Sequence, residues 1–580
     1  MTAAGSLLGL VRDQAIAHLF GASVESDAFL IAWTVPEMAA TLLIEDAMAL
    51  LLVPAFSHAL ARRAAERSGD PVRALVSATF PRLFALLACA AGLLVVGAPW
   101  VVGLLAPGFS DPGLAVDCTR LTAVTVLGFG VAGYFSAALR AHGSFLQPAG
   151  VYVAYNVGII ATTLALHSLW GVRAAAVGVA IGSVLMVLTQ LPSFARLVTA
   201  VRLPGGLPAG ARHRRRAPGR APGRAPGRAP GRAPGRAPGR APVGARRTTP
   251  ALSRPATLAR PTTPPSGPVP ASSGPVPPPS RPAPPPRGRR RAGAPLLGAA
   301  VLAPVVLFAV SRQSQVLVER FLAADLPAGA ISHLNYAQKV AQMPMVLSLM
   351  ICTVTFPVVA QAMAEGDRER ARRRVEQDLA LAGMVVLLGA AFVIGYAPQI
   401  IEVLFERGAF DAQDTATTAT VMRVYAAGLL GHSLVGALGR PFFAASRPLW
   451  YPAAAMATGL GVTTAAGLDA VGPWGVYGIA AANALGISTT ALLLLVGLGS
   501  RVVPIEVRAV TASVGRLALA AAAAAAVGGL AGPQLDDPLL SVAAGCLLVP
   551  AVFLLAARAA GAPEVVHLLA LTRQRFRHGR

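Results

Sequence analysis

The sequence predicts an all-helical protein that crosses a membrane many times. Of its 580 residues, 54% are hydrophobic and only 13% are charged, with a mean hydropathy of +0.60. About a quarter of the residues in a soluble domain are charged. Apolar stretches of the ~20 residues that a spanning helix needs recur fourteen times along the chain. The loops between these stretches alternate in charge, which is typical of a polytopic membrane protein.

The apolar stretches fall into two groups, six before a long polar segment and eight after it. The predicted spans are 4–22, 27–56, 82–105, 115–139, 148–169, 174–199, 295–322, 330–363, 376–399, 413–438, 449–468, 474–498, 511–530 and 538–559. The first, the seventh and the eighth contain charged residues, so they are the least apolar of the set. This division predicts two six-helix lobes followed by two further helices.

Loop charges test this count. If the N-terminus is cytoplasmic, the inside loops hold Arg62, Arg63, Arg67, Arg73, Arg140, Arg368, Arg370, Arg372, Arg373, Arg374, Arg447, Arg501 and Arg508. The outside loops hold Glu25, Asp27, Asp111, Asp325, Glu402, Glu406, Asp411, Asp469, Asp536 and Asp537. Only Arg173 and Arg407 depart from the positive-inside pattern. Because a wrong helix count would invert the alternation, we expect fourteen spans with both termini in the cytoplasm.

The polar segment between the groups is of low complexity. Residues 201–293 hold 20 arginines and no Asp or Glu, so this segment carries most of the net charge of +24. Six APGR units run from Ala217 to Arg240. Pro and Gly at this density form neither helix nor sheet. We expect a disordered cytoplasmic linker that is either a tether to anionic lipids or a plain spacer, and we expect no nucleic-acid partner.

These features define the expected domains. They are an N-terminal lobe at 1–202, the linker at 203–293, a second lobe at 294–500, two extra spans at 501–560 and a basic cytoplasmic tail at 561–580. Signatures of catalysis are missing, since the chain has no Walker loop, no HExxH and no GxSxG at a strand-to-helix turn. The four cysteines are far apart and suggest neither a disulfide framework nor a zinc site. We therefore expect a non-enzyme with no cofactor and no metal.

Charged residues inside the predicted spans are the candidate functional residues, because a charge at bilayer depth costs at least a few kcal/mol. They are Arg12, Asp13, His18, Asp27, Glu45, Asp46, Arg312, Glu319, Arg320 and Lys339. Arg12 and Asp13 are adjacent and point about 100° apart on a helix, so we do not expect them to pair. The charges either form interhelical ion pairs, such as Arg12 with Glu45, or line a polar chamber. Cations left over in a chamber suit a phosphate-bearing substrate.

Several motifs in this sequence resemble one family. They are GLVRDQAIAHLFGASVESDAFLIAW, VPEMAATLLIEDAMALLLVPAF, LLAPGFSD, LNYAQKVAQMP and LFERGAF, and they cover residues 4 to about 450 in order. The chain resembles the MurJ/MviN lipid II flippases of the multidrug/oligosaccharidyl-lipid/polysaccharide exporter superfamily. The resemblance implies two pseudo-symmetric six-helix lobes plus two C-terminal helices around a cationic cavity, with alternating access coupled to membrane potential or ions.

The resemblance also implies substrate-binding residues and differences at some of them. Family cavity positions correspond to Arg12, Asp27, Glu45 and Lys339, and His18 stands where the family usually has a second arginine. Basic residues of the family are absent at Ala40 and Thr41, Lys339 replaces an arginine, and Asp46 replaces a glycine. The cavity is thus expected to be less positive than is usual for the family.

The implied function is movement of lipid II from the inner to the outer leaflet of a bacterial cell membrane by a monomer. The alternatives are a flippase for another polyprenyl-diphosphate-linked glycan, or a non-transporting scaffold of cell-wall synthesis. A membrane glycosyltransferase is disfavoured by the missing catalytic loops.

Overall fold

A computed structural model describes residues 2–42, 44, 48–65, 70–199, 299–443 and 449–562. Within these residues every regular element is a helix, so the predicted all-helical class is confirmed. Residues Met1–Ala200 and Ala294–Arg580 form one compact unit. The expected linker lies outside the described residues.

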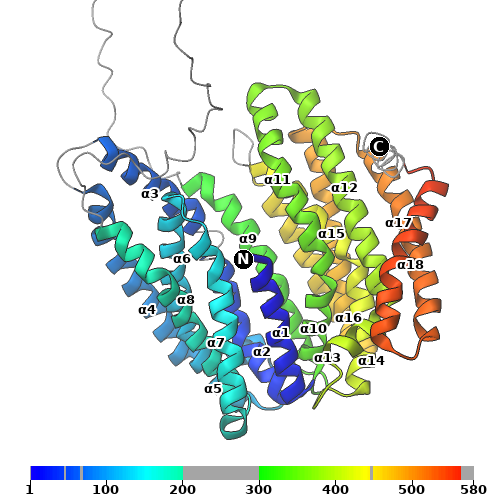
Figure 1. Cartoon of the computed structure of the whole chain (residues 1–580), viewed down its shortest axis with the longest axis horizontal. Helices are drawn as coiled ribbons and strands as arrows, with labels where there is room; N and C mark the ends of the chain where they lie inside the picture. Colours follow the sequence, from blue (N-terminus) through cyan, green and yellow to red (C-terminus); the bar gives the residue numbers. More distant parts are fainter. Residues whose placement is uncertain are drawn as a thin grey trace, which may run out of the picture. The chain divides into compact units, whose positions relative to one another are not determined.

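The N-terminal lobe contains the helices before the linker (Figure 1). They are α1 (Thr2–Phe20), α2 (Val24–Ala40), α3 (Met48–Ala65), α4 (Pro71–Leu105), α5 (Pro112–Ala123), α6 (Thr125–Ala141), α7 (Leu146–Trp170) and α8 (Arg173–Thr199). Three helix starts in the chain share an Asp-Pro pair, at Asp70, Asp111 and Asp537. Each aspartate accepts a backbone N–H of the first turn, and the following proline has no N–H to leave unpaired.

The second lobe and the extra helices follow the linker. They are α9 (Ala299–Ala323), α10 (Ala330–Ala341), α11 (Met343–Glu365), α12 (Arg368–Gly395), α13 (Ala397–Phe405), α14 (Ala412–Ala427), α15 (Leu429–Phe443), α16 (Tyr451–Arg501), α17 (Val507–Ala531), the 3-10 turn η3 (Gly532–Gln534) and α18 (Pro538–Ala559). The 51-residue α16 is two helices joined at Gly475, whose backbone is not helical (φ 52°, ψ −130°). This break separates the two predicted spans 449–468 and 474–498.

Each predicted span falls on a helix or on a pair of consecutive helices. In the described part of the chain, eight helices are long and apolar enough to cross a membrane, and the α14–α15 pair, bent by 43°, makes up to nine. The predicted spans outside this set are α1, the α2–α3 pair, α9 and the α10–α11 pair. Among them, α2 and α10 have only 17 and 12 residues, and α1 and α9 carry charged residues within their length.

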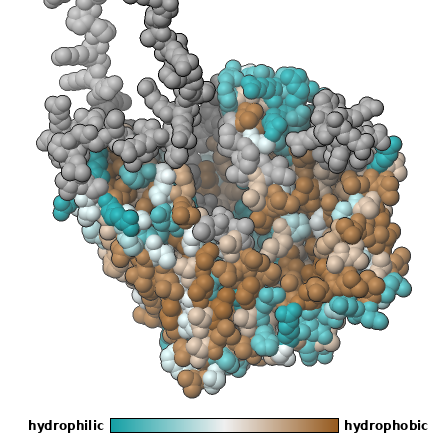
Figure 2. Space-filling view, viewed as in Figure 1, coloured by the Kyte–Doolittle hydropathy of each residue, from teal (hydrophilic) through white to brown (hydrophobic). Residues whose placement is uncertain are grey.

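The outer surface is apolar over its middle. Figure 2 shows hydrophobic side chains on the sides of the helices and hydrophilic side chains toward the two ends of the view. Trp100, Val96, Leu547 and Leu530 are each at least 75% exposed. Exposed apolar surface on this scale indicates contact with lipid. The chain is therefore a multi-pass membrane protein.

Inside the lobes, small residues let helices approach closely. A Cβ atom on Gly158 of α7 would lie 2.8 Å from the Cα of Gly182 on α8, which is too close for any side chain. Such glycine contacts are common where membrane helices pack, because lipid supplies no hydrophobic drive between helices.

Candidate functional site

A buried charge cluster joins the two lobes halfway along α1. Arg12 and Asp13 of α1 are 6% and 3% exposed. The Arg12 guanidinium donates to Asp13 Oδ1 from Nε at 3.0 Å and from Nη2 at 2.8 Å, and from Nη1 to Asn156 Oδ1 of α7 at 3.1 Å. Across the lobe boundary, Lys339 Nζ of α10 lies 3.4 Å from Asp13 Oδ2. Asp13 thus binds one cation from each lobe.

An aromatic ring completes this cluster. Arg12 Cζ lies 4.0 Å and Lys339 Nζ lies 4.6 Å from the ring centre of Trp33 on α2. Cations within about 6 Å of an indole face are attracted to it, by about 2 kcal/mol where both are desolvated. Trp33 therefore helps to hold both cations without neutralising them.

The expectation that Arg12 and Asp13 do not pair was wrong. Their Cα–Cβ bonds do diverge by about 100°, but the long arginine side chain still reaches the carboxylate of the next residue. A buried carboxylate needs a charged partner, and this local pair supplies it. Glu45 and Asp46 lie outside the described residues, so the alternative pair of Arg12 with Glu45 stays a hypothesis.

Next to the cluster is a cavity of about 200 Å³ between the lobes. Its wall on the N-terminal lobe comes from α2 and includes Glu37. On the other side, α9, α10 and α15 contribute Arg312, Arg320, Lys339 and His432. Among the described lining residues, the Arg and Lys side chains all come from the second lobe, whereas the acidic one comes from the first. Arg12 is not part of this lining and acts behind it.

Arg320 was recognised in the sequence as a charge within a span but not as a predicted binding residue. It is 3% exposed and donates to Thr34 Oγ1 at 3.4 Å, Ile331 O at 3.4 Å and Asn335 Oδ1 at 3.3 Å. These acceptors are neutral, so its positive charge is solvated by dipoles and remains available to an anion in the cavity. The signal that points to it is a second charge eight residues after Arg312 on one helix, which places both near one helical face.

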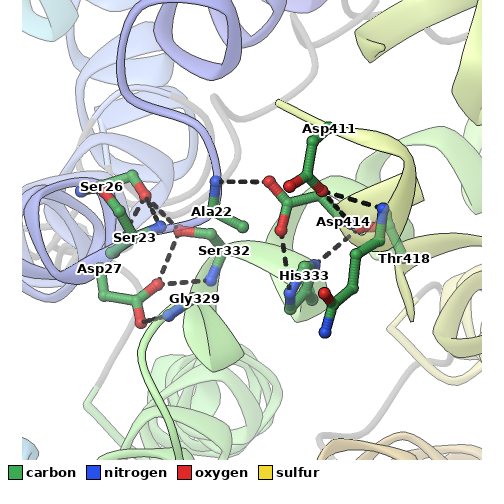
Figure 3. A network of polar contacts seen from close by, with 11 residues as sticks. Ala22, Ser23, Ser26, Asp27, Gly329, Ser332, His333, Asp411, Asp414 and Thr418 are labelled. Carbon is green, nitrogen blue, oxygen red and sulfur yellow. Dashed lines mark hydrogen bonds and ion pairs between the residues drawn. The ribbon is translucent and has the colours of Figure 1, made fainter. Parts of the chain in front are cut away.

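Asp27 is not part of the cluster, because it lies in the first turn of α2 and binds the start of α10. Figure 3 shows its contacts with Gly329 and Ser332. Its Oδ2 accepts the Gly329 N–H at 2.8 Å, and its Oδ1 accepts the Ser332 N–H at 2.7 Å and the Ser332 hydroxyl at 2.6 Å. The Ser332 hydroxyl also lies 2.8 Å from that of Ser26. Asp27 of α2 therefore caps the first turn of α10, where a negative charge is favoured by the helix dipole.

The lobes make a second set of contacts at the same end, between the end of α1 with the α1–α2 loop and the α13–α14 loop with the first turn of α14. Ala22 N–H donates to Asp414 Oδ2 at 3.3 Å, and Ala409 N–H donates to His18 O at 2.9 Å. His333 holds Asp414 from within the second lobe, with Nε2 3.8 Å from Asp414 Oδ1 and Nδ1 2.8 Å from Thr418 Oγ1. We call Asp27, Ser332, Ala22, Asp414, His18 and Ala409, with the contacts they make, the end seal. Figure 3 shows the first four of these residues.

The predicted binding residues therefore separate into two places. Arg12 and Lys339 meet at Asp13 and Trp33, and Lys339 also lines the cavity. His18 and Asp27 belong to the end seal, and the His18 side chain is exposed. Glu45 is not described. Cations of the second lobe thus line the cavity, and the lobes also meet at the end seal, whose residues are not among those that line the cavity.

Comparison with known proteins agrees with this architecture. The family model described as the lipid II flippase MurJ matches residues 16–212 and 289–534. The chain belongs to the MurJ family. This membership places it among transporters, as the sequence predicted.

Two MurJ relatives match this family member over most of its length. The lipid II flippase MurJ of Burkholderia cenocepacia is 26% identical over 502 residues, which cover 85% of this chain and 81% of that protein. The probable lipid II flippase MurJ of Haemophilus influenzae is 24% identical over 530 residues, covering 86% and 84%.

Solved structures show that the fold is shared. A lipid II flippase MurJ in an inward closed conformation matches with a TM-score of 0.65 at 17% identity, covering 95% of this chain and 96% of that one. An inward-facing multidrug resistance MATE family transporter of the MOP superfamily matches with a TM-score of 0.57 at 12% identity, covering 87% and 95%. This MurJ family member therefore has the two-lobe helical fold of those transporters.

Proposed function

We propose that this protein moves lipid II from the inner to the outer leaflet of a bacterial cell membrane by alternating access. The observation that carries the proposal is the end seal beside a cationic cavity, both built from the two lobes. A chamber closed at one end by polar contacts between lobes opens there when those contacts break. The similarity to MurJ proteins that are lipid II flippases supports lipid II as the substrate.

The diphosphate of the substrate binds the second-lobe wall of the cavity. Arg320 and Arg312 offer guanidinium forks, and Lys339 offers a point charge. Arg12 and Asp13 position Lys339 from behind. A diphosphate entering the cavity competes with Asp13 for Lys339, so substrate binding weakens the ion pair that joins the lobes at this depth.

Opening the far end requires the end seal to break. In our proposal Asp27 and His18 act there, rather than on the diphosphate, and Glu45 is a further cavity residue. The end seal is made of hydrogen bonds that each contribute about 0.5–3 kcal/mol. The free energy of substrate binding is of the same order, so it can break these bonds.

The proposed orientation in the membrane follows from the loop charges. We propose cytoplasmic N- and C-termini, with the end seal on the outside. We also propose domain boundaries at 202, 293, 500 and 560. In this proposal the protein is a monomer, and its linker contacts anionic lipids. A different polyprenyl-diphosphate-linked glycan would use the same cations, and the experiment below separates it from lipid II.

The test is rescue of a bacterium depleted of its own lipid II flippase. The wild-type chain should restore growth. In vesicles, Lys339→Gln or Arg320→Gln should reduce the translocation of labelled lipid II about tenfold or more. The reason is that each lost charge-assisted hydrogen bond is worth about 1.5–3 kcal/mol. The control is Arg173→Gln, which removes an exposed arginine paired with Asp117 and leaves translocation unchanged. Translocation of another lipid-linked glycan but not of lipid II would reassign the substrate. A well-inserted wild-type chain that moves neither would contradict transport and favour a scaffold.

A further inference from the structure

We infer that Glu37 of α2 binds a cationic group of the substrate headgroup, so that the cavity selects lipid-linked glycans that carry an ammonium group as well as a diphosphate. The inference deepens the proposed function and rests on it, because it gives the same cavity a second point of recognition. The cations that bind the diphosphate all come from the second lobe, and Glu37 lines the same cavity from the first.

The second-lobe wall of the cavity presents hydrogen-bond donors. Gln315 of α9 and Asn335 of α10 both line the cavity and are each 4% exposed. The amide nitrogens Gln315 Nε2 and Asn335 Nδ2 have no hydrogen-bond partner among the described residues. A buried donor without a partner is unfavourable. Together with Arg320 and Lys339, these amides therefore suit the oxygen atoms of an anionic ligand.

The first-lobe wall presents acceptors instead. It consists of residues at helical spacing along α2 and its C-cap, namely Thr34, Glu37, Met38 and Thr41. The Thr41 hydroxyl donates to the Glu37 carbonyl oxygen at 3.2 Å, so the lone pairs of its own oxygen are left to accept. The Glu37 carboxylate takes part in no hydrogen bond or ion pair with the part of the chain that the structure describes. A charged donor in the cavity thus finds a carboxylate and a hydroxyl oxygen one helical turn apart.

Helical geometry places Glu37 between Arg320 and Arg312 in depth. Arg320 Nε donates to Thr34 Oγ1 at 3.4 Å, so these two side chains are level. Because α2 begins at the end seal, Glu37 lies about 4.5 Å further from the seal than Thr34, three residues before it. Because α9 runs toward the seal, Arg312 lies about 12 Å further from it than Arg320. A ligand in the cavity therefore meets opposite charges at neighbouring depths on the two lobes.

The first-lobe wall suits an ammonium group better than a metal ion. Glu37 is the single Asp or Glu among the described residues that line the cavity. Hard metal cations take six or more oxygen ligands, usually with several carboxylates. An ammonium group donates three hydrogen bonds and forms a strong, charge-assisted one with a single carboxylate. Such a group can belong to the peptide or to an amino sugar of the headgroup, and the experiment below distinguishes these two sources.

A ligand with both charges bridges the two lobes. Its diphosphate binds α9 and α10, and its ammonium group binds α2. A ligand shifts a conformational equilibrium only by its differential affinity for the two states. The doubly charged headgroup favours the arrangement in which the two walls are close, whereas a glycolipid without the cation binds the second lobe alone. Recognition by Glu37 therefore affects both affinity and translocation.

The first measurement is binding of lipids to the purified full-length chain in nanodiscs. One lipid II carries a free amine on its peptide, and the second is the same lipid with that amine acetylated. The wild type should bind the free amine about tenfold or more tightly, as expected for one charge-assisted hydrogen bond. Glu37→Gln should bind the two lipids alike, and Glu37→Asp should recover part of the preference. The control is Glu25→Gln, an exposed acid on the same helix, which should keep the full preference.

A third lipid tests the source of the cation. It has the peptide amine acetylated and a free amine in place of the N-acetyl group of one sugar. A preference for this lipid that disappears in Glu37→Gln supports the inference and assigns the cation to the sugar. A wild type that binds all three lipids alike, or a preference that survives in Glu37→Gln, overturns the inference.

Translocation of the same lipids in vesicles separates the inference from the proposed function. The wild type should move the preferred lipid several-fold faster than the fully acetylated one, and Glu37→Gln should move both at one rate. A wild type that moves all three lipids at one rate supports the proposed function and overturns the inference. A wild type whose binding preference depends on Glu37 but which moves none of the lipids supports the inference and contradicts transport.

Discussion

Asp13 is the residue on which the arrangement of the central cations depends. Its two carboxylate oxygens face Arg12 on its own helix and Lys339 on the opposite lobe. Removing one partner of a buried ion pair leaves an uncompensated charge in a medium that solvates it poorly. The same interaction between exposed groups contributes little, because water and salt screen it. The protein contains a buried ion pair at Asp13 and an exposed one at Asp117, so the two can be compared.

We predict that Asp13→Asn destabilises the protein strongly, by about 3–5 kcal/mol, since it leaves Arg12 and Lys339 without their shared anion. Asp117→Asn breaks the exposed pair with Arg173 and should change stability by about 0–1 kcal/mol. The measurement is the thermal unfolding midpoint of each purified variant in one detergent. Equal shifts for the two variants would show that Asp13 is not the anion that holds the cluster together.

The sequence predicted part of this cluster. Arg12 and Lys339 had to avoid lipid, and both do. Their shared anion was missed, because helical angle alone ignores the reach of an arginine side chain. His18 and Asp27 were grouped with them as binding residues, yet they lie at the end seal. Hydropathy reports that a charge lies within a span but does not report its depth or which neighbouring helix it meets.

At the scale of helices, those that carry charged residues within their length build the site. The helices α1, α2, α9 and α10 hold the charge cluster, the cavity wall and Asp27. They are the opening helices of each lobe, and lobe-to-lobe contacts cover their polar faces. Span positions were predictable because bilayer thickness fixes their length. The breaks at Val124 and Gly428 were not, since apolar composition continues across them.

The loop between α1 and α2 sets how tightly the end seal closes. Gly21 has φ +62°, and a Cβ atom there would lie 2.5 Å from the Ala409 carbonyl oxygen. We predict that Gly21→Ala pushes the α1–α2 loop away from the α13–α14 loop and opens the seal. A cysteine placed at Ser23 should then react faster with a membrane-impermeant thiol reagent added from outside.

Gly143→Ala is the matched control for this change. Gly143 has φ +78° but open space around its Cβ position, so it carries the same backbone strain without a clash. It should leave the reactivity of the cysteine at Ser23 unchanged. If both variants raise that reactivity alike, general destabilisation and not the contact with Ala409 is responsible.

At the scale of the whole molecule, the cavity and the end seal are coupled. Both are built from the two lobes, so a movement of one lobe against the other changes them together. Cores and interfaces switch between discrete packings and do not deform continuously. The fold class was predictable from hydropathy and loop charge, but this coupling was not, because it depends on which helices of the two lobes touch.

A disulfide across the end seal tests whether this movement is required. The hydroxyl oxygens of Ser26 and Ser332, on opposite lobes, lie 2.8 Å apart, so cysteines at both positions are close enough to cross-link. In a background with Cys89, Cys118, Cys352 and Cys546 replaced by alanine, oxidation of Ser26→Cys/Ser332→Cys should abolish lipid II translocation, and reduction should restore it. The control pair is Ser348→Cys/Ser433→Cys, whose hydroxyl oxygens are also 2.8 Å apart but lie within the second lobe. Oxidation of that pair should leave translocation intact, because no lobe boundary is crossed. Translocation that continues through a fully oxidised Ser26–Ser332 cross-link would show that the substrate crosses without the seal opening.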